Sequence, residues 1–399
     1  MPGGKSGRTS AMTKRKRENE QSAAPPRRAV SPYLSYLIGF AVVILTAAAV
    51  GGLAFMKSQQ TPQAPPAEPA PAPAPAPAPT HDNTPLRDFK VVNAHEHLMA
   101  RKFLDKYLSA AQETGVVKTL FVASSDYTLK GSKFEQSTGN DENTEAILAA
   151  AREFPDKIVP YCTIHPGDPE KLDKIRKYVA EGAKGLKLYT GHGNFYDRPL
   201  DAPDMLPVYA YCEETRLPIC WHVNIVKYAA EFERVMTKFP KLIVIVPHFG
   251  VTFFRPREAP FQEFQRLMDV YPYLYTDTCF GTRNILIDGL EAVSRDPQPF
   301  RDFIAKYSDR VLFGTDMVIT GNKEKSDKWT ADVIRACRQV LERDSYSFYM
   351  GAKGSPYASK SSGNEKGVFR GLALDDATLR KIYETNFDHL MALSQPPAL

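Results

Sequence analysis

The segment Val91-Val92-Asn93-Ala94-His95-Glu96-His97-Leu98 places two histidines directly after a short, mainly apolar run. This run, residues 89–94, predicts a buried β-strand. Side chains along a strand point alternately to its two faces, so His95 and His97 share one face and Glu96 lies on the other. Two imidazoles on one face form half of a metal site. An isolated pair is more typical of an ordinary surface strand, so the rest of the chain must decide.

Short β-rich runs alternate with amphipathic helical segments from residue 86 onward. The predicted strands are 89–94, 119–123, 158–164, 185–189, 218–223, 242–247, 274–279 and 311–314. The clearest predicted helices are 143–154, 169–181, 205–215, 228–239, 260–271 and 300–307. Such alternation predicts parallel strands with right-handed crossovers, and eight strands favour closure into an α/β (β/α)8 TIM barrel. An open doubly wound sheet is the alternative, but no Gly-rich phosphate loop follows the first strand.

Polar residues recur at or near the ends of several predicted strands. Lys187 stands in the fourth strand, His222 ends the fifth, His248-Phe249-Gly250 follows the sixth and Gly314-Thr315-Asp316 follows the eighth. Taken singly, each has an ordinary explanation, such as a lysine that reaches solvent or an aspartate that caps a helix. Because the carboxyl ends of barrel strands meet at one rim, where barrel enzymes hold their active sites, their joint occurrence predicts a metal site.

These residues, together with His95-x-His97, resemble the ordered motifs of the amidohydrolase superfamily. The closing Tyr383-Glu384-Thr385-Asn386-Phe387 resembles the terminal helix of the amidohydrolase-2 branch. The resemblance covers residues 88–395. It implies a metal-dependent TIM-barrel enzyme, most often a hydrolase.

The resemblance also implies roles for the polar residues. In the version with one metal ion, His95, His97, His222 and Asp316 hold Zn²⁺ or Mn²⁺, and His248 lies beside the water or the substrate oxygen. Imidazoles with a carboxylate suit Zn²⁺ with one position open to water, whose pKa then falls toward about 7. Asp316 can accept a proton from that water and pass it to the leaving group.

Lys187 suggests an alternative site that holds two metal ions. In some relatives the equivalent lysine is carboxylated and bridges two metal ions. Desolvation lowers the pKa of a lysine and so favours the neutral amine that reacts with CO₂. The sequence leaves the choice between one ion and two open.

Three classes of function remain in view. The first is a hydrolase of an amide, lactone or ester bond, and the second is a metal-dependent decarboxylase or hydratase of a small carboxylic acid. The third is a non-catalytic envelope protein that uses the barrel to bind a ligand. Candidate partners for an anionic group of a small-molecule substrate are His192, Arg255, Arg257 and Arg283, although solvated surface side chains are the commoner explanation. Cys279, at the end of the seventh strand, is the one thiol expected to face the pocket.

The N-terminal part differs in composition from the barrel. Residues 1–30 are basic and polar and are expected to be a disordered cytoplasmic tail. Residues 33–56 carry no charge. As a helix they would span about 36 Å, which predicts a transmembrane anchor over residues 31–56. The Pro/Ala-rich residues 57–85 predict a semi-rigid linker, and residues 86–399 the barrel domain.

Charge is distributed unevenly along the chain. Residues 1–60 have a net charge of +7 within a total of +5, which leaves −2 for the remainder. The barrel therefore has no basic surface typical of nucleic-acid binding. The positive-inside rule places the N-terminus in the cytoplasm and the barrel on the far side of the membrane, periplasmic or extracellular. A cleaved signal peptide is the alternative. The sequence gives no indication of the oligomeric state.

Overall fold

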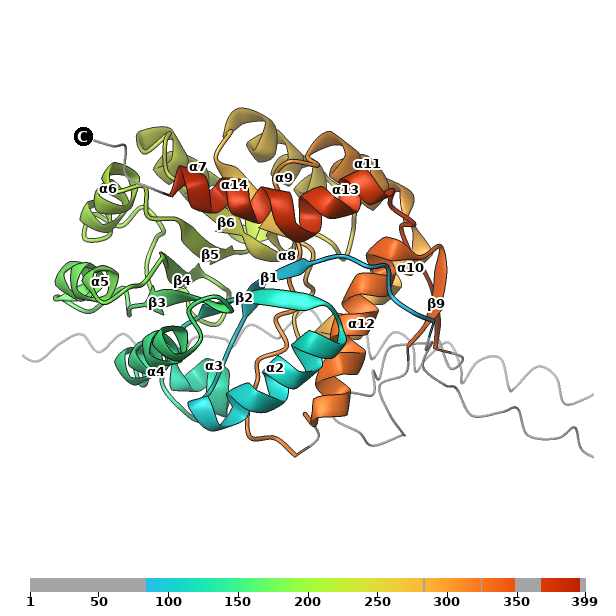
Figure 1. Ribbon diagram of the computed structural model, residues 1–399. Helices are drawn as coiled ribbons and strands as arrows, with labels where there is room; N and C mark the ends of the chain where they lie inside the picture. Colours follow the sequence, from blue (N-terminus) through green and yellow to red (C-terminus); the bar gives the residue numbers. More distant parts are fainter. Residues whose placement is uncertain (1–83, 283, 324, 349–366, 395–399) are drawn as a thin grey trace, which may run out of the picture. The chain divides into compact units, whose positions relative to one another are not determined.

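The computed structural model describes residues 84–282, 284–323, 325–348 and 367–394. Eight parallel strands lie at its centre in chain order (Figure 1). They are β1 (Val91–Glu96), β2 (Val116–Val122), β3 (Ile158–Thr163), β4 (Gly185–Gly191), β5 (Ile219–Val223), β6 (Val244–Val246), β7 (Leu274–Asp277) and β8 (Val311–Leu312). Each strand falls on a run predicted from the sequence, with ends shifted by at most three residues.

The first and last strands are joined by backbone hydrogen bonds. Ala94 N donates to Phe313 O at 2.8 Å, Asp316 N to His95 O at 2.9 Å and Ile319 N to His97 O at 2.8 Å. The segment after β8 therefore runs beside β1, and the sheet forms a nearly closed α/β TIM barrel. This closure excludes the open doubly wound sheet.

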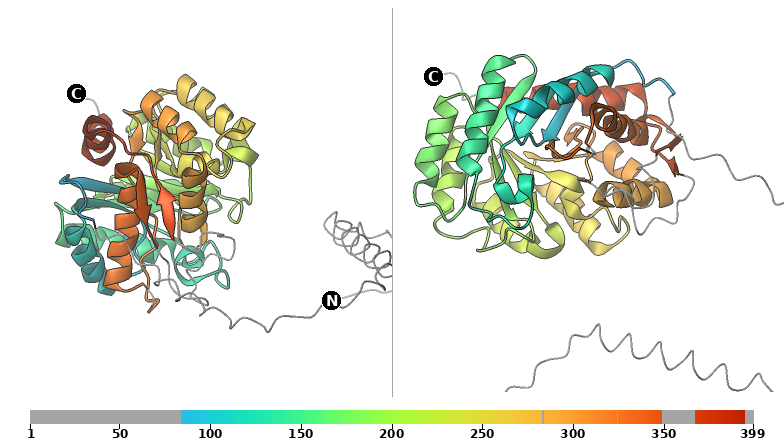
Figure 2. Two further views of the ribbon diagram at one scale, coloured as in Figure 1. Left: turned by 90° about the vertical axis from the view of Figure 1, so that its right-hand side faces the viewer. Right: turned by 90° about the horizontal axis from the view of Figure 1, so that it is seen from below.

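Helices surround the strands, as Figures 1 and 2 show. The principal ones are α2 (Leu104–Glu113), α4 (Asn140–Glu153), α5 (Lys171–Ala180), α6 (Leu206–Glu214), α7 (Ile225–Lys238), α9 (Ala259–Val270), α11 (Gln298–Lys306) and α12 (Asp327–Glu342). The six helices predicted from the sequence are confirmed. Each presents an apolar face to the strands, as a barrel core requires.

The C-terminal helices cover the end of the barrel where the strands begin. Here α13 (Asp376–Arg380), the π-helical turn η2 (Lys381–Thr385) and α14 (Asn386–Leu393) follow one another. The amide of Asn386 donates to Val311 O at 2.8 Å, and Phe387 and Leu390 pack against Leu120 and Tyr275 in the core. This end of the barrel is therefore closed by side chains, which leaves the opposite rim for chemistry.

Some connecting segments contain more regular structure than expected. Residues 281–298, predicted as a loop, contain helix α10 (Asn284–Arg295). The physical reason is that Leu286, Leu290 and Val293 recur at helical spacing and are all buried. Shorter elements are η1 (Arg101–Phe103), α3 (Asp126–Lys130), α8 (Pro247–Val251) and the antiparallel pair β9 (Ser345–Ser347) and β10 (Val368–Arg370).

The predicted N-terminal features lie almost entirely outside the described residues. These are the basic tail, the apolar segment 31–56 and the linker up to residue 83. Among the helices of the described ranges, none is both long and apolar enough to cross a membrane.

Candidate metal centre

Four imidazole rings gather at the carboxyl ends of β1, β5 and β6. The ring centroids of His95 and His97 lie 5.3 Å apart, those of His95 and His248 5.5 Å, and those of His222 and His248 5.0 Å. His95, His97 and His248 are buried, and His222 is partly exposed. The predicted convergence of histidines at one rim is thus present in the fold.

Asp316 reaches the same cluster from the segment after β8. Its Oδ1 lies 3.0 Å from His97 Nε2, and its Oδ2 lies 3.4 Å from His248 Nε2. The backbone of Asp316 has φ +48°, in the left-handed region that side chains other than glycine seldom adopt. Such strain is characteristic of functional sites.

The Nδ1 atoms of three rings point away from Asp316 and meet hydrogen-bond acceptors. His95 Nδ1 lies 2.9 Å from Asp277 Oδ2, and His248 Nδ1 lies 3.1 Å from Cys279 O. His97 Nδ1 lies 2.6 Å from the hydroxyl of Ser124, which donates to Val122 O. An acceptor at Nδ1 keeps the ring proton there, so each Nε2 presents a lone pair on its other side.

The protonation states of the histidines and of Asp316 indicate that a positive charge is needed in this cluster. Burial lowers the pKa of His97 to about 4 and also lowers the pKa values of His222 and His248, so these imidazoles are neutral at pH 7. Burial raises the pKa of Asp316, but positive charge on His95, His97 and His248 outweighs burial and holds the pKa well below the ordinary value. The ionised carboxylate is therefore stable beside these rings only when a positive charge, either protons or a metal ion, lies among them.

A divalent metal ion fits this donor set. The buried Oδ1 of Asp316 has no hydrogen-bond partner among the described residues, although His97 Nε2 is only 3.0 Å away. Imidazole nitrogens with one carboxylate oxygen are the ligands that Zn²⁺ binds, and Mn²⁺ accepts the same types. His95, His97 and Asp316 of the predicted ligand set come together here. His222 joins the cluster through ring contacts with His248 and with His192, whose centroid is 4.4 Å away.

Cys279 offers a different ligand set. Ligand atoms of His95, His248, Cys279 and Asp316 all lie within 4.8 Å of one another. However, the sulfur sits on the Nδ1 side of the rings, 3.4 Å from His95 Nδ1 and 3.2 Å from His248 Nδ1. Burial also raises the pKa of this thiol well above its ordinary value, and the thiol donates to Asp277 Oδ1 at 2.9 Å. We therefore assign Cys279 to the support of the rings and not to the metal.

Lys187 is fully buried beside the histidines. Its Nζ lies 3.0 Å from His95 Nε2 and 3.5 Å from Cys220 Sγ. Burial opposes the charged form, but the surrounding Cys220, Tyr189 and two aspartates outweigh it and leave the pKa of Lys187 raised. This differs from the expectation that desolvation favours the neutral amine. The arrangement favours an ammonium that donates to His95 Nε2, the lone pair that a bound metal ion would take instead.

Asp277 holds several parts of the site and was not recognised from the sequence. Besides His95, it accepts hydrogen bonds from His248 N at 3.0 Å and Cys279 N at 3.3 Å. Burial raises its pKa, but the hydrogen bonds to His95 and Cys279 and the charges of His95 and His248 together outweigh burial and lower the pKa to about 2. The signal in the sequence was an aspartate near the end of a predicted strand.

Glu96 fixes the position of the segment that carries Asp316. Its carboxyl group accepts from Thr315 Oγ1 at 2.7 Å, Met317 N at 3.1 Å and Val318 N at 2.8 Å. Burial raises its pKa to about 7. The strand alternation that separates Glu96 from the two histidines thus turns it toward the neighbouring strand segment, where it acts as a clamp.

The backbone permits close packing at two further points. In α8, His248 has φ +59° and Phe249 φ +50°, so the turn after β6 is left-handed and directs His248 into the cluster. At Gly314, an added Cβ would lie 3.2 Å from His95 Cβ and 3.4 Å from Asp277 Cβ. The glycine before Thr315 therefore allows the segment after β8 to pass close to both residues.

Comparison with protein families now adds to the geometry. The amidohydrolase-2 family model, described as amidohydrolase, matches residues 93–386. This chain belongs to the amidohydrolase superfamily. The match spans the strands that carry all of the histidines described above. No match was found among curated proteins.

Several solved structures resemble this amidohydrolase. The 2,6-dihydroxybenzoate decarboxylase from Rhizobium is 13% identical, with a TM-score of 0.46 over 76% of this chain and 98% of that one. A 5-carboxyvanillate decarboxylase from Novosphingobium aromaticivorans, complexed with manganese, is 14% identical, with a TM-score of 0.47 over 76% and 96%. An amidohydrolase from Burkholderia multivorans with bound zinc is 10% identical, with a TM-score of 0.49 over 76% and 99%.

The predicted partners of an anionic substrate group lie in different surroundings. His192 contacts His222, and burial lowers its pKa to about 4. Arg255 pairs with Glu258 at 3.2 Å and Arg257 with Asp296 at 2.5 Å, both at the surface. Arg283 lies outside the described residues. The geometry therefore favours the surface explanation for Arg255 and Arg257.

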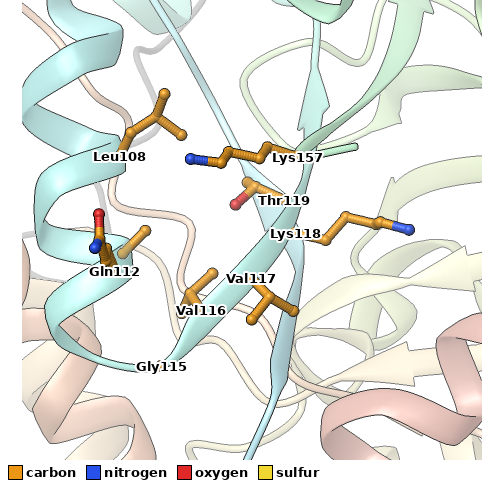
Figure 3. A pocket seen from close by; sticks show the side chains of 9 residues that line it. Leu108, Gln112, Gly115, Val116, Val117, Lys118, Thr119 and Lys157 are labelled. Atoms are coloured by element: carbon orange, nitrogen blue, oxygen red, sulfur yellow. The ribbon is translucent and has the colours of Figure 1, made fainter. Parts of the chain in front are cut away.

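Two cavities lie at opposite ends of this amidohydrolase barrel. The cavity in Figure 3, about 220 Å³, is lined by Gly115, Val116 and Lys157 at the start of β2, away from the histidines. A larger one of about 670 Å³ is lined by Met99 and Val318, each two residues beyond a candidate ligand. The second cavity therefore lies at the same end of the barrel as the metal centre, although none of the candidate ligands lines it.

Proposed function

We propose that this amidohydrolase is a metal-dependent hydrolase that cleaves an amide, lactone or ester bond with a metal-activated water. The observation that carries the proposal is the convergence of the Asp316 carboxylate on two imidazoles, with Oδ1 3.0 Å from His97 Nε2 and Oδ2 3.4 Å from His248 Nε2. A Zn²⁺ or Mn²⁺ ion held by His95, His97, His222 and Asp316 would satisfy all of these acceptors.

Each residue around the ion has a role that follows from its contacts. The bound metal would supply Lewis acidity and lower the pKa of a coordinated water. Asp316, whose Oδ1 has no hydrogen bond from the described part of the chain, accepts the proton of the attacking water and returns it to the leaving group. His248 lies beside Asp316 Oδ2 and orients the water or the substrate oxygen.

Lys187 supports a second candidate, a metal-dependent decarboxylase or hydratase of a small carboxylic acid. A buried ammonium 3.0 Å from a candidate metal ligand can bind a substrate carboxylate next to the ion. Asp316 or His248 would then move a proton to or from carbon.

The test measures metal content and turnover on the purified full-length protein. We expect about one Zn²⁺ or Mn²⁺ per chain by elemental analysis. Turnover of a panel of lactones, amides, esters and aromatic acids should fall by about 100-fold or more in Asp316→Asn. Surface Asp269→Asn is the matched control. Release of CO₂ without consumption of water would select the decarboxylase, and a protein that binds neither metal would revive a non-catalytic binding role.

We also infer that the apolar residues 33–56 anchor the enzyme in a membrane. The basic N-terminal flank would remain in the cytoplasm and the barrel would lie on the far side. Membrane fractionation followed by protease treatment of intact cells tests this. Recovery of the full-length chain in the soluble fraction would contradict it, and a shortened N-terminus would indicate a cleaved signal peptide.

A further inference from the structure

We propose that Lys187 and Cys220 form a site of oxidative modification, in which hydrogen peroxide joins Lys187 Nζ to Cys220 Sγ through one bridging oxygen atom. The pair lies inside the barrel on β4 and β5, and the two atoms are 3.5 Å apart. Both side chains are fully buried. The modification goes beyond the proposed function, because the bridge forms without a metal ion and without a substrate.

The strand register holds the two side chains opposite each other. Lys187 and Cys220 are directly paired in the parallel ladder between β4 and β5, and so are the next residues, Leu188 and Trp221. Strand side chains alternate between the two faces of a sheet. Leu188 and Trp221 pack in the cluster between the strands and the helices, whereas Cys220 packs with Tyr161 in the barrel interior. Lys187 and Cys220 therefore both point into the barrel.

An amine, and not a second thiol, is the reactive group next to Cys220. All five cysteines are free, and Cys162 on the neighbouring strand β3 packs toward the helices. Within the ranges that the structure describes, Lys187 is the one side chain within hydrogen-bond distance of Cys220 Sγ. An oxidised cysteine condenses with whichever thiol or nitrogen lies beside it. The expected product of oxidation is therefore a link between lysine and cysteine, with no disulfide.

The open rim of the barrel gives a small oxidant a route to the pair. His222 follows Cys220 by two residues on the same face of β5 and is partly exposed. Hydrogen peroxide, which is little larger than water, therefore has to pass only one layer of side chains. Burial raises the pKa of the Cys220 thiol to about 11 against the opposing charge of Lys187, so the thiol is protonated at pH 7 and its oxidation is slow.

The reaction balances with two molecules of hydrogen peroxide. The first forms an S–O bond at Cys220, which becomes a sulfenic acid, and releases one water. The second takes two electrons from the sulfenic acid and the Lys187 ammonium, so that an N–O bond forms and two waters and one proton are released. The 3.5 Å between Nζ and Sγ accommodates the bridging oxygen after a small movement of the lysine side chain.

The bridge changes the surroundings of the candidate metal centre. In the reduced protein the Lys187 ammonium donates to His95 Nε2 at 3.0 Å. The bridged nitrogen carries no positive charge and is drawn toward β5. Oxidation therefore frees a lone pair of His95 and removes a positive charge beside it, and reduction by a thiol reverses both effects.

The test exposes the purified full-length protein to hydrogen peroxide overnight, followed by proteolysis without reductant and mass spectrometry. We expect linked peptides that contain Lys187 and Cys220 and are about 14 Da heavier than their sum, the mass of one oxygen less two hydrogens. Dithiothreitol should separate them. Lys187→Arg should abolish the linked peptides and leave Cys220 as a sulfinic acid, whereas Lys184→Arg, exposed just before β4, should keep them. Protein unfolded in urea should give the sulfinic acid alone.

Three results on the wild type would overturn the proposal. The first is Cys220 oxidised to a sulfinic acid beside an unmodified Lys187. The second is a folded protein that stays unmodified under conditions that oxidise the unfolded chain, and the third is an equal yield of linked peptides from folded and unfolded protein. Because all three concern the wild type, they decide the matter even where Lys187→Arg does not fold. Absence of Zn²⁺ and Mn²⁺ from the same sample would count against the proposed function and leave the bridge standing.

Discussion

A buried carboxylate, Asp277, and a partly buried one, Asp316, meet the same imidazole cluster. Asp277 accepts hydrogen bonds on the Nδ1 side of the rings, whereas Asp316 faces Nε2 atoms and has one oxygen without a hydrogen bond from the described residues. A carboxylate that accepts the Nδ1 proton of a ligand histidine fixes the tautomer and raises the basicity of the other nitrogen. Asp277 thus prepares His95 to bind a metal, and Asp316 is the group available for chemistry.

Replacement of Asp277 by asparagine should therefore weaken metal binding without removing a ligand. We expect the dissociation constant for Zn²⁺ to rise by roughly 10- to 100-fold, because the amide no longer provides a charged acceptor for His95 Nδ1. Competition with a chromophoric chelator measures the constant. Asp269→Asn, which alters a surface pair with Lys306, is the control. An unchanged constant in Asp277→Asn would show that His95 is oriented without its carboxylate partner.

The sequence indicated the candidate metal ligands better than the residues that hold them in position. His95, His97, His248 and Asp316 follow predicted strands, so strand alternation and barrel topology place them together. Asp277 and Glu96 could not be assigned in this way, because their partners are backbone and side-chain groups of other strands. The left-handed backbone at His248 and Asp316 has no counterpart in the strand pattern either. Tertiary packing decides these features.

Among the elements, α12 contains one ion pair that is buried and one that is exposed. Glu342 accepts from Arg338 Nε at 2.7 Å and from Tyr383 OH at 2.9 Å, which ties α12 to η2. The Arg338 and Glu342 side chains are 2% and 0% exposed. Lys328 and Asp332 on the same helix form an i,i+4 pair at 2.8 Å, with Lys328 exposed.

Glu342→Gln should destabilise the protein by about 3 kcal/mol, because it leaves the Arg338 guanidinium buried without its counter-charge. Lys328→Gln on the same helix should cost less than about 0.5 kcal/mol. Urea unfolding followed by circular dichroism gives both values. Equal losses for the two variants would mean that the buried pair contributes no more than a surface pair.

The first turn of α13 depends on a side-chain cap. Asp375 Oδ1 accepts from Thr378 N at 2.8 Å, and Oδ2 accepts from Thr378 Oγ1 at 2.9 Å. These bonds lower the pKa of Asp375 below its ordinary value of 3.8, so the stabilisation is present above pH 3.8 and is lost as the pH falls through the lowered pKa. Asp375→Ala should cost about 1 kcal/mol at pH 7.

The difference between wild type and Asp375→Ala should shrink as the pH falls below 3.8. Denaturant titrations across this range measure it. Asp376→Ala is the neighbouring control, since Asp376 pairs with Arg87 in place of capping the helix. A difference that stays constant down to the acid transition would contradict the charged cap.

Helices and strands with a clear hydrophobic periodicity could be predicted from the sequence. All eight strands were located because apolar runs are bounded by polar or turn residues. Helix α10 was missed, although Leu286, Leu290 and Val293 lie on one face. The helical spacing was therefore present in a segment that was assigned to a loop.

Closure of the barrel brings together polar groups whose lone pairs repel one another. Neutral His97 and His248 and the ionised Asp316 converge from β1, β6 and the segment after β8, and the barrel closes only where β1 pairs with that last segment. Repulsion between their lone pairs therefore acts across the seam of the barrel. A bound cation would remove this repulsion and join the two edges.

Removal of the metal should consequently weaken the whole fold as well as the site. A ligand at 100 times its dissociation constant stabilises the folded state by about 2.7 kcal/mol, so chelator treatment should lower the unfolding temperature measurably, and added Zn²⁺ or Mn²⁺ should restore it. Differential scanning calorimetry measures the shift. Asp316→Asn should start with a higher metal-free unfolding temperature than wild type, because it removes the charge that faces the imidazole lone pairs, and it should gain less from added metal. If wild type and Asp316→Asn respond equally to chelator and to metal, the cation does not bind at Asp316 and does not join β1 to the segment after β8.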